Sequence, residues 1–500
     1  MDNKYCKNKI FNSKAFISLK PYLSSLFVVL LFSFPLFGFE YSTDTYHFAL
    51  RSGLSGIYGA MKYNGRLIIY LATKALEAMS VSFVGYYYIS YIMSIVFYTL
   101  AIATVYKMLR CHMEKRIAFF LAILTILNPM AFELFLFIEK GFFAFAIFMS
   151  VLACRYFLCF LQGKRWHIVF SYLFVALSCF TYQPMPGAFV ALVLVFIVKY
   201  SKTVKNFIIN TGLGVTVYGF ATFMNFIVMK LFGMSGRMGS GLNFANIYKY
   251  LTFGLNIPYL LLVYVGIFAV LFAVVFISAK KKSGKAFTKE SVLIFCQYSF
   301  IMVGTILTTA APSIVTTPEN VWFTLRYSYP IGMLVGTIPI LFNFNCEYEE
   351  KEAVFFFEKS IRKSSIVILS VFLILMVVFH SFFFSRHITN SRDEADALKI
   401  GEIIEKYEKR TGIEVKYISL YRDSDCSIYF DGVVRLPNCN VRAITTEWCN
   451  IPHINLFNGR NFVRVNNSNK YKSYFESKNW DEISEEQFIF EGSTLHLGIY

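Results

Sequence analysis

The chain has 500 residues, of which 56% are hydrophobic, 19% aromatic and 16% charged, and its formal net charge is +17 at pH 7. The mean hydropathy is +0.53. Soluble globular proteins carry about 25% charged residues, so this composition excludes an ordinary soluble enzyme. The charged residues lie between long apolar runs, a pattern typical of proteins that cross a membrane many times.

The apolar runs predict an all-α polytopic membrane domain over residues 22–385. Before it lies a cytoplasmic N-terminus, residues 1–21, and the first run has no small-residue cleavage site, so we expect a retained anchor. Eleven membrane-spanning helices are predicted, at about 22–39, 83–106, 117–138, 141–161, 167–182, 187–198, 207–229, 254–279, 290–311, 329–344 and 365–385.

The distribution of lysine and arginine predicts the orientation of these spans, because both residues favour the cytoplasmic side. With the N-terminus inside, the predicted inner segments hold 23 of them and the outer loops hold 9. This bias requires that residues 64–82 do not cross the bilayer. Arg66, Lys74 and Glu77 make that segment amphipathic, so we expect it to lie at the interface. The loop after the first span is then extracytoplasmic.

The composition changes at about Arg386. Residues 386–500 hold 15 Lys and Arg against 17 Asp and Glu, so the membrane part carries the whole positive excess. That excess fits attraction to the cytoplasmic leaflet and not nucleic-acid binding. An amphipathic helix that ends at Gly412, followed by strands at 415–421 and 461–465, predicts a small α+β extracytoplasmic domain over 386–500.

Cysteine and ligand-binding motifs are sparse. Cys426, Cys439 and Cys449 share the predicted C-terminal domain, so one disulfide could form there. The sequence contains no C-x-x-C pair, no H-E-x-x-H and no Walker-type glycine loop. We therefore expect no metal site of these types, and the sequence leaves open whether a divalent cation is used.

Polar and aromatic residues gather in the loops predicted to face outward. Ten of them stand out: Glu40, Asp44, Arg66, Glu139, Lys140, Tyr182, Gln183, Trp322, Arg326 and Tyr327. Each has an ordinary alternative as a turn charge, an interfacial aromatic or a snorkelling arginine. Carboxylates can also act as general bases, arginines can bind phosphate through two hydrogen bonds, and aromatic rings can stack on sugars. Together they suit chemistry on a sugar linked to a lipid phosphate, and also the vestibule of a transporter.

The order of the motifs resembles the Gtr-type glucosyltransferases, polytopic enzymes that decorate bacterial O-antigen or related surface glycans. An anchor is followed by "STDTYH" and "YNGRLIIYL", and then by "LNPMAFELFLFIEKGFF" and "FTYQPMPG". Members of this family show an Asp-rich stretch followed by Gly-Arg, which Asp44 and Gly65-Arg66 match. An acidic external turn is matched by Glu139, and a Tyr-Gln pair by Tyr182-Gln183. This chain has Ser42-Thr43-Asp44 where the family often has paired aspartates, which weakens any proposal of a metal or of two catalytic carboxylates.

The resemblance implies a GT-C-like fold in the bacterial cytoplasmic (inner) membrane, with the C-terminal domain outside. It also implies transfer of a glucosyl or related hexosyl residue from a polyprenyl-phosphate donor to a surface glycan such as O-antigen. The expected roles are catalysis by Asp44 and Glu40, donor-phosphate binding by Arg66, Arg326, Glu139 and Lys140, and sugar or acceptor binding by Tyr182, Gln183, Trp322 and Tyr327.

Other classes of membrane protein remain as alternatives. A lipid-linked oligosaccharide flippase or transporter would carry ionisable residues within several spans, and this chain has few, such as Glu133, Arg155 and His380. An O-antigen polymerase or ligase usually has a large loop between spans, whereas the large external segment here is C-terminal. A nucleotide-sugar synthase is disfavoured because the predicted inner loops are short and basic, too small for a Rossmann-like donor domain.

Overall fold

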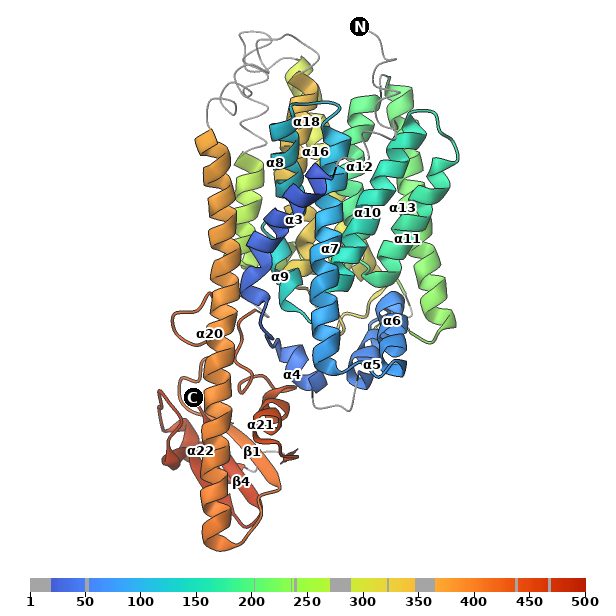
Figure 1. Cartoon of the computed structure of the whole chain (residues 1–500). Coiled ribbons are helices and arrows are strands. Elements are labelled where there is room, and N and C mark those ends of the chain that lie inside the picture. The colour runs from blue at the N-terminus through green and yellow to red at the C-terminus, as the bar shows by residue number, and fades with distance from the viewer. Residues whose placement is uncertain are drawn as a thin grey trace.

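Apolar helices form a bundle, and one long helix, α20 (Ser365–Thr411), runs along it and continues into a small domain that contains a β-sheet (Figure 1). The computed structural model describes residues 19–49, 54–201, 203–234, 236–237, 241–269, 289–321, 323–346, 365–436, 439–465 and 469–500. The predicted helical membrane part and the small sheet near the C-terminus are both present. Residues 1–18, Trp322 and most of the basic segment 280–289 lie outside the described residues.

Five helical segments in the described residues are long and apolar enough to cross a membrane. They are α7 (Phe83–Leu109), α10 (Lys140–Leu161), α13 (Val204–Leu231), Phe295–Val315 and Ser370–Thr411. Ala245–Asn256 and Pro258–Ala269 meet at 93°, and this bent pair would make a sixth span. Shorter apolar helices are Lys20–Leu36, α11 (His167–Thr181) and α12 (Pro186–Tyr200). Helix length and composition thus support five or six spans in the described residues, fewer than the eleven predicted from the sequence.

Two predicted spans are divided, and the first division lies at a proline. The segment predicted at 117–138 forms α8 (Lys115–Ile126) and α9 (Ala131–Leu136). Pro129 lies between them and cannot donate a helical hydrogen bond. The segment predicted at 329–344 begins with the short helix α17 (Tyr329–Gly332) and continues as α18 (Leu334–Cys346), which contains Pro339.

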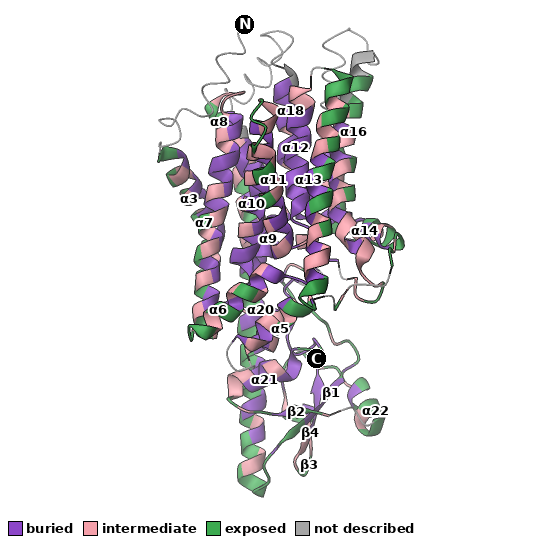
Figure 2. Cartoon of the chain, turned by 90° about the vertical axis from the view of Figure 1, so that its right-hand side faces the viewer, coloured by how far each residue is buried: buried purple, intermediate pink, exposed green. Residues whose placement is uncertain are grey.

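The outer helices expose apolar side chains along their length (Figure 2). Val204 and Ile208 on α13 are 76% and 63% exposed, and Val377 on α20 is 67% exposed. The outward face of α16 (Lys289–Ala310) is similar, with Leu293 60% exposed. Soluble monomers rarely expose large continuous apolar surfaces, whereas lipid tails would cover them. The chain is a membrane protein.

The centre of the bundle is closely packed around α10 and α12. Residues 186–197 of α12 are all buried, as expected for a helix that is apolar on every side. Helix α10 lies directly against α7, and Gly141 makes this approach possible. A Cβ atom added at Gly141 would lie 2.4 Å from the carbonyl oxygen of Ser90, so a larger residue would separate the two helices.

Three short helices lie at the end of the bundle that faces the C-terminal domain (Figure 1). They follow α3 (Lys20–Ser33) and η1 (Phe34–Leu36), and are α4 (Thr43–Ala49), α5 (Ser55–Tyr63) and α6 (Leu67–Ala78). Helix α6 is the amphipathic segment predicted at 64–82. Its 12 residues span about 18 Å at 1.5 Å per residue, which is too short to cross a hydrocarbon core of about 30 Å.

The C-terminal domain has a four-stranded sheet with the order β2-β1-β4-β3. Strand β1 is parallel to both of its neighbours, and β3 is antiparallel to β4. The elements are β1 (Tyr417–Arg422), α21 (Asn450–Asn458), β2 (Val463–Arg464), α22 (Lys472–Glu476), β3 (Phe488–Glu491) and β4 (Thr494–Ile499). The strands predicted at 415–421 and 461–465 are confirmed. Helix α20 stops before Gly412, whose φ is +70°, as the predicted helix end requires.

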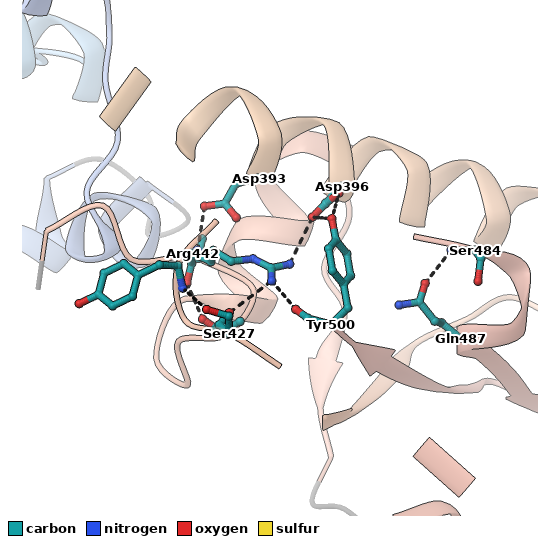
Figure 3. Close-up of polar contacts among 10 residues, drawn as sticks. Asp393, Asp396, Ser427, Arg442, Ser484, Gln487 and Tyr500 are labelled. Atoms are coloured by element: carbon teal, nitrogen blue, oxygen red, sulfur yellow. Dashed lines mark hydrogen bonds and ion pairs between the residues drawn. The ribbon is translucent and has the colours of Figure 1, made fainter. Parts of the chain in front are cut away.

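The predicted boundary near residue 386 is not a break in secondary structure. Helix α20 has 47 residues, about 70 Å at the helical rise per residue, so it extends far beyond a bilayer core of about 30 Å. A buried arginine, Arg442, ties the domain to this helix (Figure 3). Its Nη2 lies 3.6 Å from Asp396 Oδ2, its Nη1 donates to the Tyr500 carbonyl, and the Tyr500 hydroxyl donates to Asp396 Oδ2 at 2.9 Å.

The three cysteines of this domain are not joined. Cys426, Cys439 and Cys449 are free thiols, so the disulfide considered from the sequence is absent. Burial raises the pKa of each of them. These thiols therefore stay protonated at neutral pH and are poor nucleophiles.

The C-terminal domain also holds the first loop of the chain in position. The ring of Tyr46 on α4 stacks on Tyr41 with centroids 4.6 Å apart and meets the edge of His453 on α21 at 4.9 Å. Burial lowers the pKa of His453 to about 3, so the packed ring is neutral at neutral pH. His47 Nδ1 lies 3.1 Å from the carbonyl oxygen of Trp448. Helix α4 is thus fixed against a domain some 400 residues away in sequence.

Candidate functional site

A cavity of about 720 Å³ lies where the short helices meet the bundle. Its wall is formed by α4, by the turn before α6, by the ends of α11 and α13, and by the segment 311–327. The C-terminal domain adds Trp448. Seven of the ten residues singled out from the sequence line this cavity: Asp44, Arg66, Glu139, Tyr182, Gln183, Arg326 and Tyr327.

Two of the sequence motifs contact each other directly. Gly65 has φ +69°, a left-handed conformation that favours glycine. The side chain of Gln183 donates from Nε2 to the carbonyl oxygens of Gly65 at 2.7 Å and Asn64 at 3.3 Å. The Tyr-Gln pair therefore holds the turn that presents Arg66 to the cavity.

The Gly65→Ala variant should lose more stability than the strain of a left-handed backbone would cause by itself. A Cβ at Gly65 would lie 2.2 Å from Met229 Sδ, in addition to a backbone strain of about 1–3 kcal/mol. Gly412→Ala is the matched control, because Gly412 has φ +70° and an added Cβ there meets nothing within 4 Å. Thermal unfolding in detergent should give a larger loss for Gly65→Ala. Equal losses in the two variants would contradict the close packing of this turn.

Arg66 is buried and held on two sides. Its Nη1 lies 3.7 Å from Glu139 Oε1, and its guanidinium lies over the ring of Tyr182 at 4.8 Å. Burial raises the pKa of Glu139, and the positive charge of Arg66 opposes that rise. Arg66 therefore covers one face of the Tyr182 ring, and Tyr182 orients the arginine. The sugar binding expected of Tyr182 from the sequence stays a prediction.

Arg326 pairs with Glu133, a carboxylate within the span predicted at 117–138. Glu133 on α9 is fully buried and accepts a hydrogen bond from the backbone N–H of Arg326. The Arg326 Nη1 lies 3.5 Å from Glu133 Oε1, and the guanidinium lies 3.6 Å above the ring of Phe137. Helix η3 (Leu325–Ser328) thus carries an arginine fixed by α9 and directed along the cavity wall.

Asp44 lies in the first turn of α4 and is partly buried. It is near enough to Arg66, Arg326 and Glu139 to influence each of them electrostatically. The Asp44 carboxylate makes no hydrogen bond and no ion pair with any of the described residues. A carboxylate with open acceptor positions in a lined cavity can take a proton from a bound molecule.

Arg237 is a further cationic residue of the cavity that the sequence-based selection missed. It lies in the loop after α13, in "GMSGRMGSG", and lines the wall within electrostatic range of Arg66 and Arg326. The only signal in the sequence was a single arginine in a glycine-rich loop. The charged lining residues are three arginines with Asp44 and Glu139, so the lining has a net positive charge.

Glu40 and Lys140 do not line the cavity. Glu40 Oε1 lies 2.8 Å from His387 Nδ1, and its other oxygen accepts from Asn390, so this carboxylate links the first loop to α20. Lys140 is buried, with its ammonium group 4.0 Å from the ring centroid of Tyr87 and 5.7 Å from that of Tyr91. Trp322 is the one remaining residue of the ten selected from the sequence, and it lies outside the described residues.

Neither a metal site in the described residues nor a similarity to known proteins indicates the function. Within the part of the chain that the structure describes, no group of three or more His, Cys, Asp or Glu side chains is arranged to hold a metal ion. No protein-family model matches the chain, and no curated protein matches it. The function therefore has to be argued from the cavity itself.

Proposed function

We propose that this protein is a membrane glycosyltransferase that moves a glucosyl or related hexosyl residue from a polyprenyl-phosphate donor to a surface glycan such as O-antigen. The observation that carries the proposal is the single cavity in which Asp44 shares a wall with three arginines, at one end of an apolar bundle. A carboxylate opposite cations suits a reaction that removes a proton and releases a phosphate.

The donor would be held by its phosphate and by its lipid tail. Arg66, Arg237 and Arg326 supply planar guanidinium groups that match phosphate oxygens. Phe223 on α13 and Leu242 line the cavity and are 55% and 67% exposed. These apolar side chains would contact a polyprenyl chain that remains in the bilayer while its head group enters the cavity.

The proposed reaction is a direct displacement. An acceptor hydroxyl oxygen forms a bond to the anomeric carbon of the donor sugar, and its proton passes to Asp44. The bond between the anomeric carbon and the phosphate oxygen breaks, and the electron pair leaves with polyprenyl phosphate. The additional negative charge on that phosphate is stabilised by the arginines. The products are a glycosidic bond and polyprenyl phosphate, and no nucleotide takes part.

The proposed topology is a GT-C-like arrangement of eleven crossings in the bacterial inner membrane, with the N-terminus inside and the C-terminal domain outside. The Lys and Arg bias supports it. In Figure 1, the junction of α7 and α8, which carries Lys107, Arg110, Lys115 and Arg116, lies at the opposite end of the bundle from α4, α5 and α6. The cavity would then face the periplasm, where nucleotide sugars are absent and lipid-linked sugars are the available donors.

The test is transfer from a defined donor. Purified protein in lipid nanodiscs, given labelled polyprenyl-phosphate glucose and an O-antigen acceptor, should move label to the glycan without any nucleotide. Parallel reactions with the galactose and mannose donors would establish which hexose is used. Strict dependence on UDP-glucose would contradict the proposal. Movement of the lipid-linked sugar across proteoliposomes without transfer would establish the flippase alternative instead.

A further inference from the structure

A second cavity, of about 400 Å³, lies in the C-terminal domain and has no role in the displacement described above. Its lining includes the last residues of β1 and β4 and residues of α21 and α22. Ligand sites in sheets with parallel strands occur at the carboxyl ends of the strands. Arg422 is the last residue of β1 and Ile499 the last of β4, so the cavity has this position.

Basic side chains outnumber acidic ones by three to two in the lining of this second cavity, which we call the basic cleft. Arg422, Arg464 and Lys472 line it together with Glu447 and Glu476. The Lys472 ammonium lies 3.7 Å from Glu476 Oε1, so among the described residues Arg422 is the cation of this lining that has no carboxylate partner. This excess of positive charge occurs in a domain whose acidic residues outnumber its basic ones. The basic cleft is therefore a local feature and not a consequence of the overall charge of the domain.

The two guanidinium groups are held in place from behind. Arg422 Nη2 donates to the carbonyl oxygen of Thr445 at 3.2 Å, a contact with a neutral group that leaves the charge of Arg422 in place. Arg464 Nη1 donates to the Glu447 carbonyl at 3.0 Å, and its Nη2 lies 3.1 Å from Glu447 Oε1. A guanidinium has five N–H donors, so both can also bind an incoming anion.

The basic cleft and the first cavity share one segment of chain. Trp448 lines the first cavity, whereas Glu447 and Asn450 line the basic cleft. Consecutive Cα atoms are about 3.8 Å apart, so Glu447 in one lining and Trp448 in the other are direct neighbours in the chain. His47 contacts the carbonyl of Trp448, which fixes this segment beside Asp44 on α4.

We propose that the basic cleft binds an acidic group, a carboxylate or a phosphate, of the acceptor glycan, while a neighbouring sugar of the same glycan passes Trp448 into the first cavity. This inference rests on the proposed function and specifies its acceptor class as an anionic polysaccharide. An extended glycan would bridge the two cavities along the segment 447–450, which contributes residues to both linings. Trp448 is 46% exposed, and a sugar can stack on an indole ring.

Direct binding tests the basic cleft without any transfer reaction. The purified full chain in detergent is titrated with oligogalacturonate, a phosphorylated mannan oligosaccharide or the neutral maltohexaose. At least one acidic probe should bind, with an affinity that falls as salt is raised, and maltohexaose should bind at least tenfold more weakly. The acidic probe that binds identifies the carboxylate or the phosphate as the recognised group. Equal binding of the neutral and acidic probes, or binding of none, would overturn the inference.

Charge-removing variants locate the binding. Arg422→Gln with Arg464→Gln should weaken binding of the acidic probe by roughly tenfold for each guanidinium removed. Lys406→Gln with Lys409→Gln removes two exposed charges of α20 outside the cleft, and this control should bind as the wild-type protein does. Equal weakening in both pairs would overturn the inference. The binding titration contains no sugar donor, so it is independent of the transfer reaction. A protein that binds acidic glycan through the cleft but transfers no sugar in the nanodisc assay would refute the proposed function and leave the inference on the basic cleft intact.

Discussion

Asp44→Asn is expected to reduce glycosyl transfer by about 10²–10⁴-fold, the usual effect of removing a general base. The amide has the same shape as the carboxylate but cannot accept the proton of the acceptor hydroxyl. Asp44 is partly buried on the cavity wall, so the change should have little effect on folding. The measurement is label transfer from polyprenyl-phosphate sugar in nanodiscs, together with a melting temperature that stays close to that of the wild-type protein.

Two controls rank the carboxylates near this position. Glu319 is exposed and does not line the cavity. The Glu319→Gln variant should therefore transfer sugar at the wild-type rate. Glu40→Gln should keep more activity than Asp44→Asn but unfold at a lower temperature, because Glu40 binds His387 and Asn390 on α20. If Asp44→Asn transfers sugar at the wild-type rate, Asp44 is a surface residue of the loop and the proposed mechanism fails.

Residues that lie at helix ends were correctly selected from the sequence as cavity residues. Gly65-Arg66 and Tyr182-Gln183 were selected separately, and the structure joins them through the hydrogen bond from Gln183 to the Gly65 carbonyl. Both lie where a helix begins or ends, and helix ends carry unpaired backbone groups that polar side chains satisfy. Polar residues in predicted loops on one side of the membrane were therefore a useful guide.

Long-range contacts could not be predicted in the same way. Glu40 and Asp44 look equivalent in the sequence, only four residues apart, but Glu40 binds α20 and Asp44 faces the cavity. That difference depends on where α20 lies, and hydrophobic periodicity contains no information on it. Trp448 reaches the cavity from the far end of the chain for the same reason.

Helix boundaries were predicted least well. The apolar run at 117–138 is continuous in composition but is interrupted at Pro129, because proline lacks the N–H that a helix requires. The opposite error occurred near residue 386, where composition changes but α20 continues to Thr411. Backbone hydrogen bonding determines where a helix ends, and a change from apolar to polar side chains does not interrupt it.

Arg326→Gln should have the second large effect, because it separates a buried ion pair. Glu133 is fully buried and the Arg326 side chain is 13% exposed. Removing one partner of a buried pair costs about 3–5 kcal/mol, since the remaining charge has no compensation. Denaturation in detergent should therefore show a strongly destabilised variant, and transfer should be lost as well.

The double variant Glu133→Gln with Arg326→Gln separates stability from function. Two neutral amides in place of two opposite charges leave no uncompensated charge, so most of the lost stability should return. Transfer should not return, because the guanidinium proposed to stabilise the leaving phosphate is still missing. A double variant that recovers both stability and the wild-type transfer rate would limit Arg326 to a structural role, and the leaving phosphate would then have to depend on Arg66 and Arg237.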